Sequence, residues 1–181
     1  DIVSFSGDKL LGAPQAGIIL GDTSSINVMK KNPFARALRP DKFTLSALER
    51  TLLLYLDMDA AKKEIPVLRM IYEKREALKK RSKSIAGAIH RISPGLSVTV
   101  VELDSEVGGG SFPDLSIPSC GIALKPLGIS VETLEERLRG LETPIIGRIE
   151  KDRLLIDMRT VLKSDEPVIV SGIRKALQDG K

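Results

Sequence analysis

Short apolar runs separated by turn residues open the chain. Residues 1–6 (DIVSFS) and 16–20 (AGIIL) each contain a short apolar run, and each segment is followed by a glycine and an aspartate. This pattern is typical of buried strands that end in tight turns. We therefore expect two buried strands, which are candidate neighbours in one sheet. Because a chain rarely starts inside a core strand, we also expect strand partners upstream of residue 1.

The following segments have helical periodicity. Three small polar residues, 23–25, are candidate caps for a short helix over 25–31. From Thr44, apolar residues recur at the spacing of one helix face and predict a helix that is capped by Thr44 and ends near 57–59. A second pattern predicts one long helix from about 63 to 91 that links two lobes. The apolar face of the first of these two helices consists of Leu45, Leu48, Leu52 and Tyr55.

The remainder of the chain alternates strands and helices. The predicted strands span 97–103, 119–126, 145–149 and 153–158, and the predicted helices span 130–141 and 165–179. The order strand, strand, helix, strand, strand, helix indicates a layered sheet with helices on one face. The predicted fold class is therefore α/β.

Composition narrows the class of protein. With 181 residues, of which 42% are hydrophobic and 29% charged, the chain can form the core of one generous domain or two small ones. It has neither an apolar run of about 18 residues nor a basic secretory leader, so we expect no membrane span and a cytoplasmic protein. A single cysteine, Cys120, and a single histidine, His90, argue against a disulfide, a zinc site and a Cys/His nucleophile. We expect no bound metal.

Positive charge is concentrated in one segment. Residues 61–92 contain ten Lys and Arg against three Glu, although the net charge of the whole chain is only +4. Such a block attracts phosphates, but a solvated helix face is the more common explanation of a basic helix. Aromatic residues make up only 3% of the chain, which argues against a stacking platform for single-stranded nucleic acid.

Lys9 is the sharpest candidate for chemistry. It follows the first predicted strand in Ser6-Gly7-Asp8-Lys9, where glycine permits a tight turn and the strand holds the amine in place. A fixed lysine amine can form a Schiff base with an aldehyde cofactor. Taken alone, a lysine in such a turn is more often solvated and inert.

A longer pattern around this lysine resembles a known family. Residues 6–17 (SGDKLLGAPQAG), residues 31–42 (KNPFARALRPDK) and the segment from Gly147-Arg148-Ile149 to Asp157-Met-Arg-Thr160 occur in this order. Together they resemble the bacterial selenocysteine synthases, the L-seryl-tRNA(Sec) selenium transferases, over nearly the whole chain. Ala13 departs from the family pattern, which has a second glycine there.

The resemblance implies a transferase of selenocysteine biosynthesis that uses pyridoxal 5′-phosphate (PLP) attached to Lys9. In this family the seryl group of seryl-tRNA(Sec) undergoes β-elimination to an aminoacrylate, and selenophosphate then supplies selenium to give selenocysteinyl-tRNA(Sec). Lys9, once released from the cofactor, is the expected general base for the α-proton. Asp8 matches a family position associated with proton transfer or orientation, and a turn residue that binds backbone amides is an equal alternative.

Arg36 and Arg39 are spaced to bind one anion. Three residues apart, they project from one side of a helical turn, and guanidinium groups suit tetrahedral anions. Without the resemblance they are ordinary surface residues, and with it they match the residues that hold selenophosphate. The resemblance also makes Gln15 a candidate cofactor contact. Arg159 is expected to form a structural ion pair, and the glycines 108–110 are expected in a flexible loop.

The resemblance further implies the C-terminal part of a fold-type-I PLP-dependent transferase. Residues 1–43 are then the end of the PLP-binding catalytic domain, 44–92 are linking helices, and 93–181 form a small C-terminal α+β domain. The other cofactor contacts of such enzymes lie upstream of the lysine, so we expect an incomplete chain that is inactive alone. The family also implies homo-oligomers in which dimers assemble into a larger ring.

Two other functions fit the residues. A related PLP-dependent lyase that acts on a small amino acid shares the fold and the lysine but not the tRNA substrate. A non-enzymatic basic module binds RNA through residues 61–92. The arginine pair separates the first alternative from a selenium transferase, because a small-substrate lyase does not need a second anion site.

Overall fold

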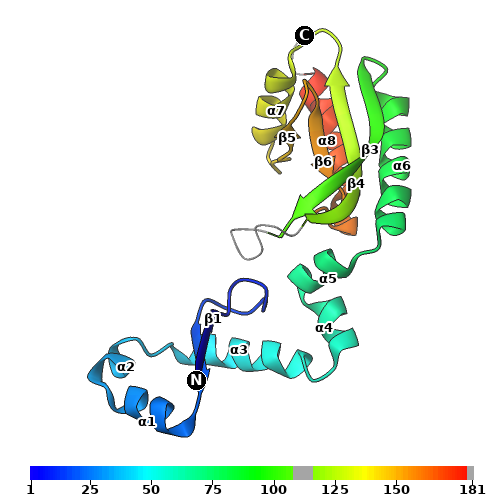
Figure 1. Cartoon of the computed structure of the whole chain (residues 1–181). Coiled ribbons are helices and arrows are strands. Elements are labelled where there is room, and N and C mark those ends of the chain that lie inside the picture. The colour runs from blue at the N-terminus through cyan, green and yellow to red at the C-terminus, as the bar shows by residue number, and fades with distance from the viewer. Residues whose placement is uncertain (108–115, 179–181) are drawn as a thin grey trace. The chain divides into compact units, whose positions relative to one another are not determined.

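The structure is a computed structural model that describes residues 1–107 and 116–178. It divides the chain into two compact units, Asp1–Tyr72 and Glu73–Lys181 (Figure 1). Each unit contains both helices and strands, which confirms the α/β class. The glycine loop expected at 108–110 lies outside the described residues.

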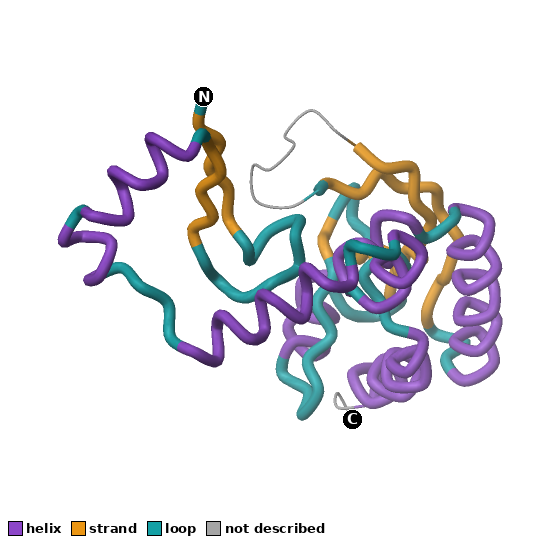
Figure 2. Tube along the Cα trace, turned by 90° about the horizontal axis from the view of Figure 1, so that it is seen from below, coloured by secondary structure: helices purple, strands orange, loops and turns teal. Residues whose placement is uncertain are grey.

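The first unit begins with two antiparallel strands. β1 (Ile2–Ser6) pairs with β2 (Gly17–Gly21), in a register that places Ser6 opposite Gly17. The two strands lie side by side in Figure 2, so their pairing in one sheet is confirmed. The expectation that they are buried is wrong, because every residue of β1 is exposed. A two-stranded pair buries little unless a further layer covers it.

Aspartates immediately upstream, rather than the expected hydroxyl residues, cap helices in this unit. Asp22 accepts a hydrogen bond from the backbone N–H of Ser25, and Asp41 accepts two at the start of the next long helix. The predicted caps at 23–25 and Thr44 are therefore wrong, since the carboxylate directly before each helix already binds its free N–H groups. The helices of the unit are α1 (Thr23–Lys31), α2 (Pro33–Ala37), α3 (Lys42–Leu54), α4 (Met58–Glu64) and α5 (Pro66–Tyr72).

The single helix expected over 63–91 is also wrong, because the chain breaks twice. Ile65 is extended, with φ −83° and ψ 115°, and Lys74 is extended, with φ −71° and ψ 136°. Pro66 explains the first break, since proline disfavours helical geometry at the residue before it and has no N–H to donate. The basic segment is consequently divided between the two units, and only its second part continues as α6 (Arg75–Ile92).

The second unit is built on an antiparallel sheet. Its strands are ordered β3-β4-β6-β5, so β4 and β6 occupy the centre. The register places Val100 opposite Ile122, and Ile122 opposite Ile156. The elements after α6 are β3 (Leu96–Glu106), β4 (Ser116–Pro126), α7 (Val131–Arg139), β5 (Arg148–Ile149), β6 (Leu154–Asp157), a short 3₁₀ helix η1 (Lys163–Asp165) and α8 (Glu166–Gln178).

One face of β4 forms the core of this unit. Cys120, Ile122 and Leu124 alternate along the strand and are fully buried. The helices α6, α7 and α8 contribute their apolar sides to the same cluster. Figure 1 shows these helices beside the sheet. This confirms the expected layer of helices on one face. The helix residues in the cluster include Leu78, Ile85 and Ile89 of α6, Leu134 and Leu138 of α7, and Ile169 and Ile173 of α8.

Arg81 joins α6 to the segment that runs from the end of β6 to the start of α8. Its guanidinium donates to the Glu166 carboxylate at 2.6 Å, to the Val161 carbonyl at 2.6 Å and to the Met158 carbonyl at 3.1 Å. The side chain is largely buried, so these bonds replace the water that the charge has lost. This arginine of the basic segment is therefore a structural residue.

Asp157 joins three strands of the sheet. Its carboxylate accepts hydrogen bonds from the hydroxyls of Ser105 on β3 and Ser119 on β4, and from the backbone N–H of Arg159. Both serines are buried. We refer to Asp157, Ser105 and Ser119 as the serine–aspartate anchor.

Across the residues that the structure describes, no helix combines the length and the apolar character needed to cross a lipid bilayer.

Candidate active site

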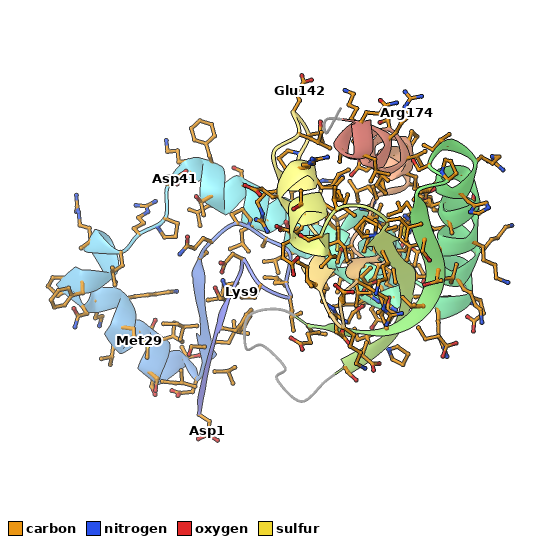
Figure 3. The ribbon with its side chains drawn as sticks, turned by 90° about the horizontal axis from the view of Figure 1, so that it is seen from above. Asp1, Lys9, Met29, Asp41, Glu142 and Arg174 are labelled. Carbon is orange, nitrogen blue, oxygen red and sulfur yellow. The ribbon has the colours of Figure 1, made fainter. Side chains whose placement is uncertain are left out.

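The loop that follows β1 is closed by its own backbone. The Gly7 N–H donates to the Ala16 carbonyl at 2.9 Å, and the Ala13 N–H donates to the Gly7 carbonyl at 2.8 Å. Within the loop, the Gly12 N–H donates to the Lys9 carbonyl at 3.0 Å, which closes a four-residue turn from Lys9 to Gly12. Lys9 thus stands at the first position of a hydrogen-bonded turn. Figure 3 labels its side chain on the ribbon of this loop.

Two glycines make this loop possible. Gly12 has φ +68°, and a Cβ placed there would lie 2.4 Å from Cγ2 of Ile65. A Cβ at Gly7 would lie 2.6 Å from the carbonyl oxygen of Pro14. Both positions require glycine, for backbone conformation in the first case and for space in both. The positive φ of Gly12 therefore shapes the turn.

Lys9 and Asp8 form a hydrogen-bonded ion pair. Nζ of Lys9 donates to Oδ2 of Asp8 at 2.6 Å, and the hydroxyl of Ser6 donates to the other oxygen of the same carboxylate. These two hydrogen bonds lower the pKa of Asp8 to about 2. At neutral pH Asp8 is therefore an ionised acceptor that orients the amine. The Lys9 side chain is 57% exposed, so a ligand can reach Nζ from solvent.

The arginine pair lies on and just after α2. Both side chains are exposed, and the backbone N–H of Arg39 donates to the carbonyl of Arg36 at 3.4 Å. The two residues are thus kept within one helical turn, as their spacing predicts. Among the residues that the structure describes, the arginine side chains make no hydrogen bond or ion pair with Lys9 or Asp8.

The remaining candidates divide between loop and core. Gln15 is exposed in the same closed loop as Lys9. Arg159 is 6% exposed, and its guanidinium donates to the carbonyls of Pro118 at 2.7 Å and Glu73 at 3.0 Å. The side chain is thus buried within the second unit and bound to backbone carbonyls, and its expected ion pair stays a prediction. Cys120 is buried in the core, as a small apolar residue is expected to be.

The sequence alone did not indicate the hydrogen bond that the Tyr55 hydroxyl makes. Tyr55 was expected only on the apolar face of a helix, yet its hydroxyl donates to the Leu11 carbonyl at 2.9 Å and lies 3.4 Å from the Leu10 carbonyl. Both carbonyls belong to the turn that begins at Lys9. A signal was present, because a tyrosine among apolar positions normally finds a partner for its hydroxyl when it is buried.

The basic segment 61–92 is partly neutralised by carboxylates outside it. Arg75 and Lys79 both form ion pairs with Glu102 of β3, and Arg81 is bonded to Glu166 of α8. The local charge counted from the sequence therefore overstates the positive potential of α6. This argues against an RNA-binding module as the main function.

Comparison with known proteins identifies the sequence pattern. The family model for L-seryl-tRNA selenium transferase (SelA) matches residues 1–162. The L-seryl-tRNA(Sec) selenium transferase of Geobacter sulfurreducens is 45% identical over 177 residues, which are 97% of this chain and 38% of that protein. The protein of the same name from Aquifex aeolicus is 46% identical over 179 residues, which are 99% of this chain and 38% of that protein.

A solved structure is similar in fold. The structure of a D-glucosaminate-6-phosphate ammonia-lyase aligns with 99% of this chain and 44% of its own chain, with a TM-score of 0.63 and 22% sequence identity. At this identity the likeness concerns the fold alone. The present chain spans about 38% of the length of the selenium transferases that it matches. The match over residues 1–162, together with the identity to the two transferases, shows that the chain belongs to the L-seryl-tRNA(Sec) selenium transferase family.

Proposed function

We propose that this chain is the C-terminal portion of an enzyme that converts seryl-tRNA(Sec) to selenocysteinyl-tRNA(Sec), and that Lys9 is the residue to which its PLP is attached. The observation that carries the proposal is the ion pair of Lys9 with Asp8, in a glycine-dependent loop of a chain that belongs to this family. We further propose that the chain acts within a longer protein, since it spans about 38% of its relatives. Alone it is expected to be inactive.

The residues present fit an aldehyde cofactor at Lys9. An accessible primary amine at the start of a closed turn is the group that such an aldehyde needs, and the Asp8 carboxylate holds its direction. When bound, PLP supplies the electron sink that makes the α-proton of the seryl group acidic. Gln15, exposed in the same loop, is available as a further contact.

The chain's own groups then have separate tasks. Nζ of Lys9 accepts the α-proton of the seryl group, and Asp8 remains an ionised acceptor that keeps this amine in position. Arg36 and Arg39 bind the oxygens of selenophosphate through their exposed guanidinium groups. The homo-oligomeric ring that the family implies is part of the same proposal.

The test uses a chimera in which these 181 residues replace the matching segment of the Aquifex aeolicus transferase. After incubation with PLP and reduction with borohydride, we expect the trapped cofactor on the peptide that contains Lys9. Lys9→Ala should abolish both trapping and formation of selenocysteinyl-tRNA(Sec). A trapped adduct that persists in Lys9→Ala would disprove the attachment at Lys9.

The arginine pair provides the second arm of this experiment. Replacing Arg36 and Arg39 together by Ala should leave trapping unchanged and lower selenium transfer by at least about 100-fold, since two charge-assisted contacts are lost. Lys63→Ala, which removes an exposed cation elsewhere in the same unit, is the matched control. Full selenium transfer by the double variant would favour a different anion site.

A further inference from the structure

Tyr55 connects the loop of Lys9 to the helices that follow it in the first unit. The residue lies at the C-terminal end of α3 and is half-buried beside the cluster of Ala61, Ile65 and Leu68. The ring is thereby held by packing. Its hydroxyl points to the backbone of a loop more than 40 residues earlier in the chain.

The two carbonyls that the Tyr55 hydroxyl meets are the central ones of the Lys9 turn. The hydroxyl donates to Leu11 at 2.9 Å, and the Leu10 carbonyl lies at 3.4 Å, a weaker second acceptor. The turn itself is closed by the bond from the Gly12 N–H to the Lys9 carbonyl. Because residues 10 and 11 lie in the same closed turn as Lys9, a group that holds their backbone also holds the Cα of Lys9.

The same helices touch the turn at a second place. Gly12 packs so tightly against the junction of α4 and α5 that a Cβ would lie 2.4 Å from Ile65 and 3.2 Å from Val67. One contact is steric and the other is a directed hydrogen bond. Together they hold the turn against a hydrophobic cluster rather than leaving it on a solvated loop.

The protonation state of the Tyr55 hydroxyl suits a hydrogen-bond donor. A tyrosine hydroxyl is protonated and able to donate at neutral pH, and burial raises the pKa of Tyr55 further. The proton of this hydroxyl is directed to the Leu11 carbonyl. The hydroxyl can therefore hold the turn in place, and it is not directed at a substrate.

We propose that Tyr55 is a positioning residue for Lys9: its hydroxyl anchors the Lys9–Gly12 turn and so sets the place and direction of the lysine amine beside Asp8. The inference rests on the proposed function, in which Lys9 carries the cofactor. It adds Tyr55, the C-cap of α3, to the residues that determine how readily PLP attaches to Lys9.

The experiment compares the two tyrosines of the chain in the chimera described above. Tyr55→Phe removes only the anchoring hydroxyl and keeps the ring in the cluster. Tyr72→Phe is the matched control, because Tyr72 is 54% exposed and belongs to the same unit. Covalent attachment is measured as the PLP concentration that gives half-maximal borohydride trapping.

We expect Tyr55→Phe to raise this concentration about three- to tenfold, the range for loss of one hydrogen bond, and Tyr72→Phe to leave it unchanged. Amide hydrogen exchange of residues 7–16, measured without PLP, should accelerate by a similar factor in Tyr55→Phe alone. The pH at which the absorbance of the attached cofactor is half-maximal should also shift only in that variant.

Two results overturn the inference separately from the proposed function. If Lys9→Ala loses trapping while Tyr55→Phe matches the parent in trapping and exchange, Lys9 holds the cofactor and Tyr55 does not position it. If Tyr55→Phe lowers only the urea midpoint, its role is structural and the inference is wrong. If Lys9→Ala still traps the cofactor, the proposed function fails, and the inference that rests on it fails too.

Discussion

The two units of the chain differ in how completely they bury their apolar side chains. In Glu73–Lys181 the helices and one face of the sheet share a continuous core, and residues such as Ile122, Leu134 and Ile173 are completely buried. In Asp1–Tyr72 the buried apolar cluster is small and consists of Ala61, Ile65 and Leu68. Its exposed apolar residues include Phe43 at 88% and Leu56 at 84%.

This difference separates a unit that completes its own core from one that presents apolar surface. Large exposed apolar areas on a soluble protein are typical of surfaces that pack against other protein. A shallow apolar groove along α3, lined largely by Leu45, Leu48, Leu52 and Leu56, is part of this surface. The candidate site residues Lys9, Arg36 and Arg39 all belong to the unit with the small core. We infer that the site depends on surroundings that its own unit does not supply, whereas the second unit completes its own core.

Separating the units should give the largest effect. We expect residues 73–181 expressed alone to unfold cooperatively in urea, with a free energy of unfolding of the order of 5 kcal/mol, as small domains with a complete core do. Residues 1–72 alone should give no cooperative transition. Circular dichroism and hydrogen exchange of both pieces measure this. A cooperative transition in 1–72 would contradict the comparison.

Two leucine truncations sharpen the same contrast within the whole chain. Leu134→Ala, which empties a fully buried position of α7, should lower the free energy of unfolding by about 2–5 kcal/mol. Leu56→Ala, at a position that is 84% exposed, should change it by less than about 0.5 kcal/mol. Urea denaturation gives both values. Comparable losses in the two variants would mean that Leu56 is covered in solution.

The smallest effect concerns the titration of Asp8. Its pKa of about 2 lies below the ordinary value of 3.8, so its hydrogen bonds stabilise the loop above about pH 4 and are lost as the pH falls through about 2. Ser6→Ala removes one of these bonds and should raise the pKa of Asp8 toward 3.8. Ser4→Ala, on the same strand, is the control. Carboxyl titration by NMR measures the shift, and an unchanged pKa in Ser6→Ala would show that Ser6 does not donate in solution.

The sequence predicted those parts of the fold that depend on local periodicity. Alternating and helical patterns located β1, β2, the long strands of the second unit and α7. The long helix failed because its apolar spacing continues through Pro66, where the backbone cannot remain helical. The burial of β1 failed for a different reason: exposure depends on which layer covers a strand, and periodicity within the strand does not contain that information.

The candidate site shows the same division between local and long-range information. The Lys9 turn and the spacing of Arg36 and Arg39 are local features, and the sequence was sufficient to find them. The contact of Tyr55 with Leu11 joins residues 44 positions apart, and the bond of Arg81 to Glu166 joins residues 85 apart. Such partners follow from the tertiary fold, so a single sequence without the structure does not reveal them.

The serine–aspartate anchor also decides how the central strands align. Sliding β4 along its neighbours by two residues would preserve the alternation of its side chains between the two faces and would still direct apolar residues toward the helices. It would nevertheless move Ser119 away from Asp157 and leave a half-buried carboxylate short of a donor. The hydrophobic pattern selects the face of β4, whereas one half-buried acid distinguishes the correct alignment from its closest competitor.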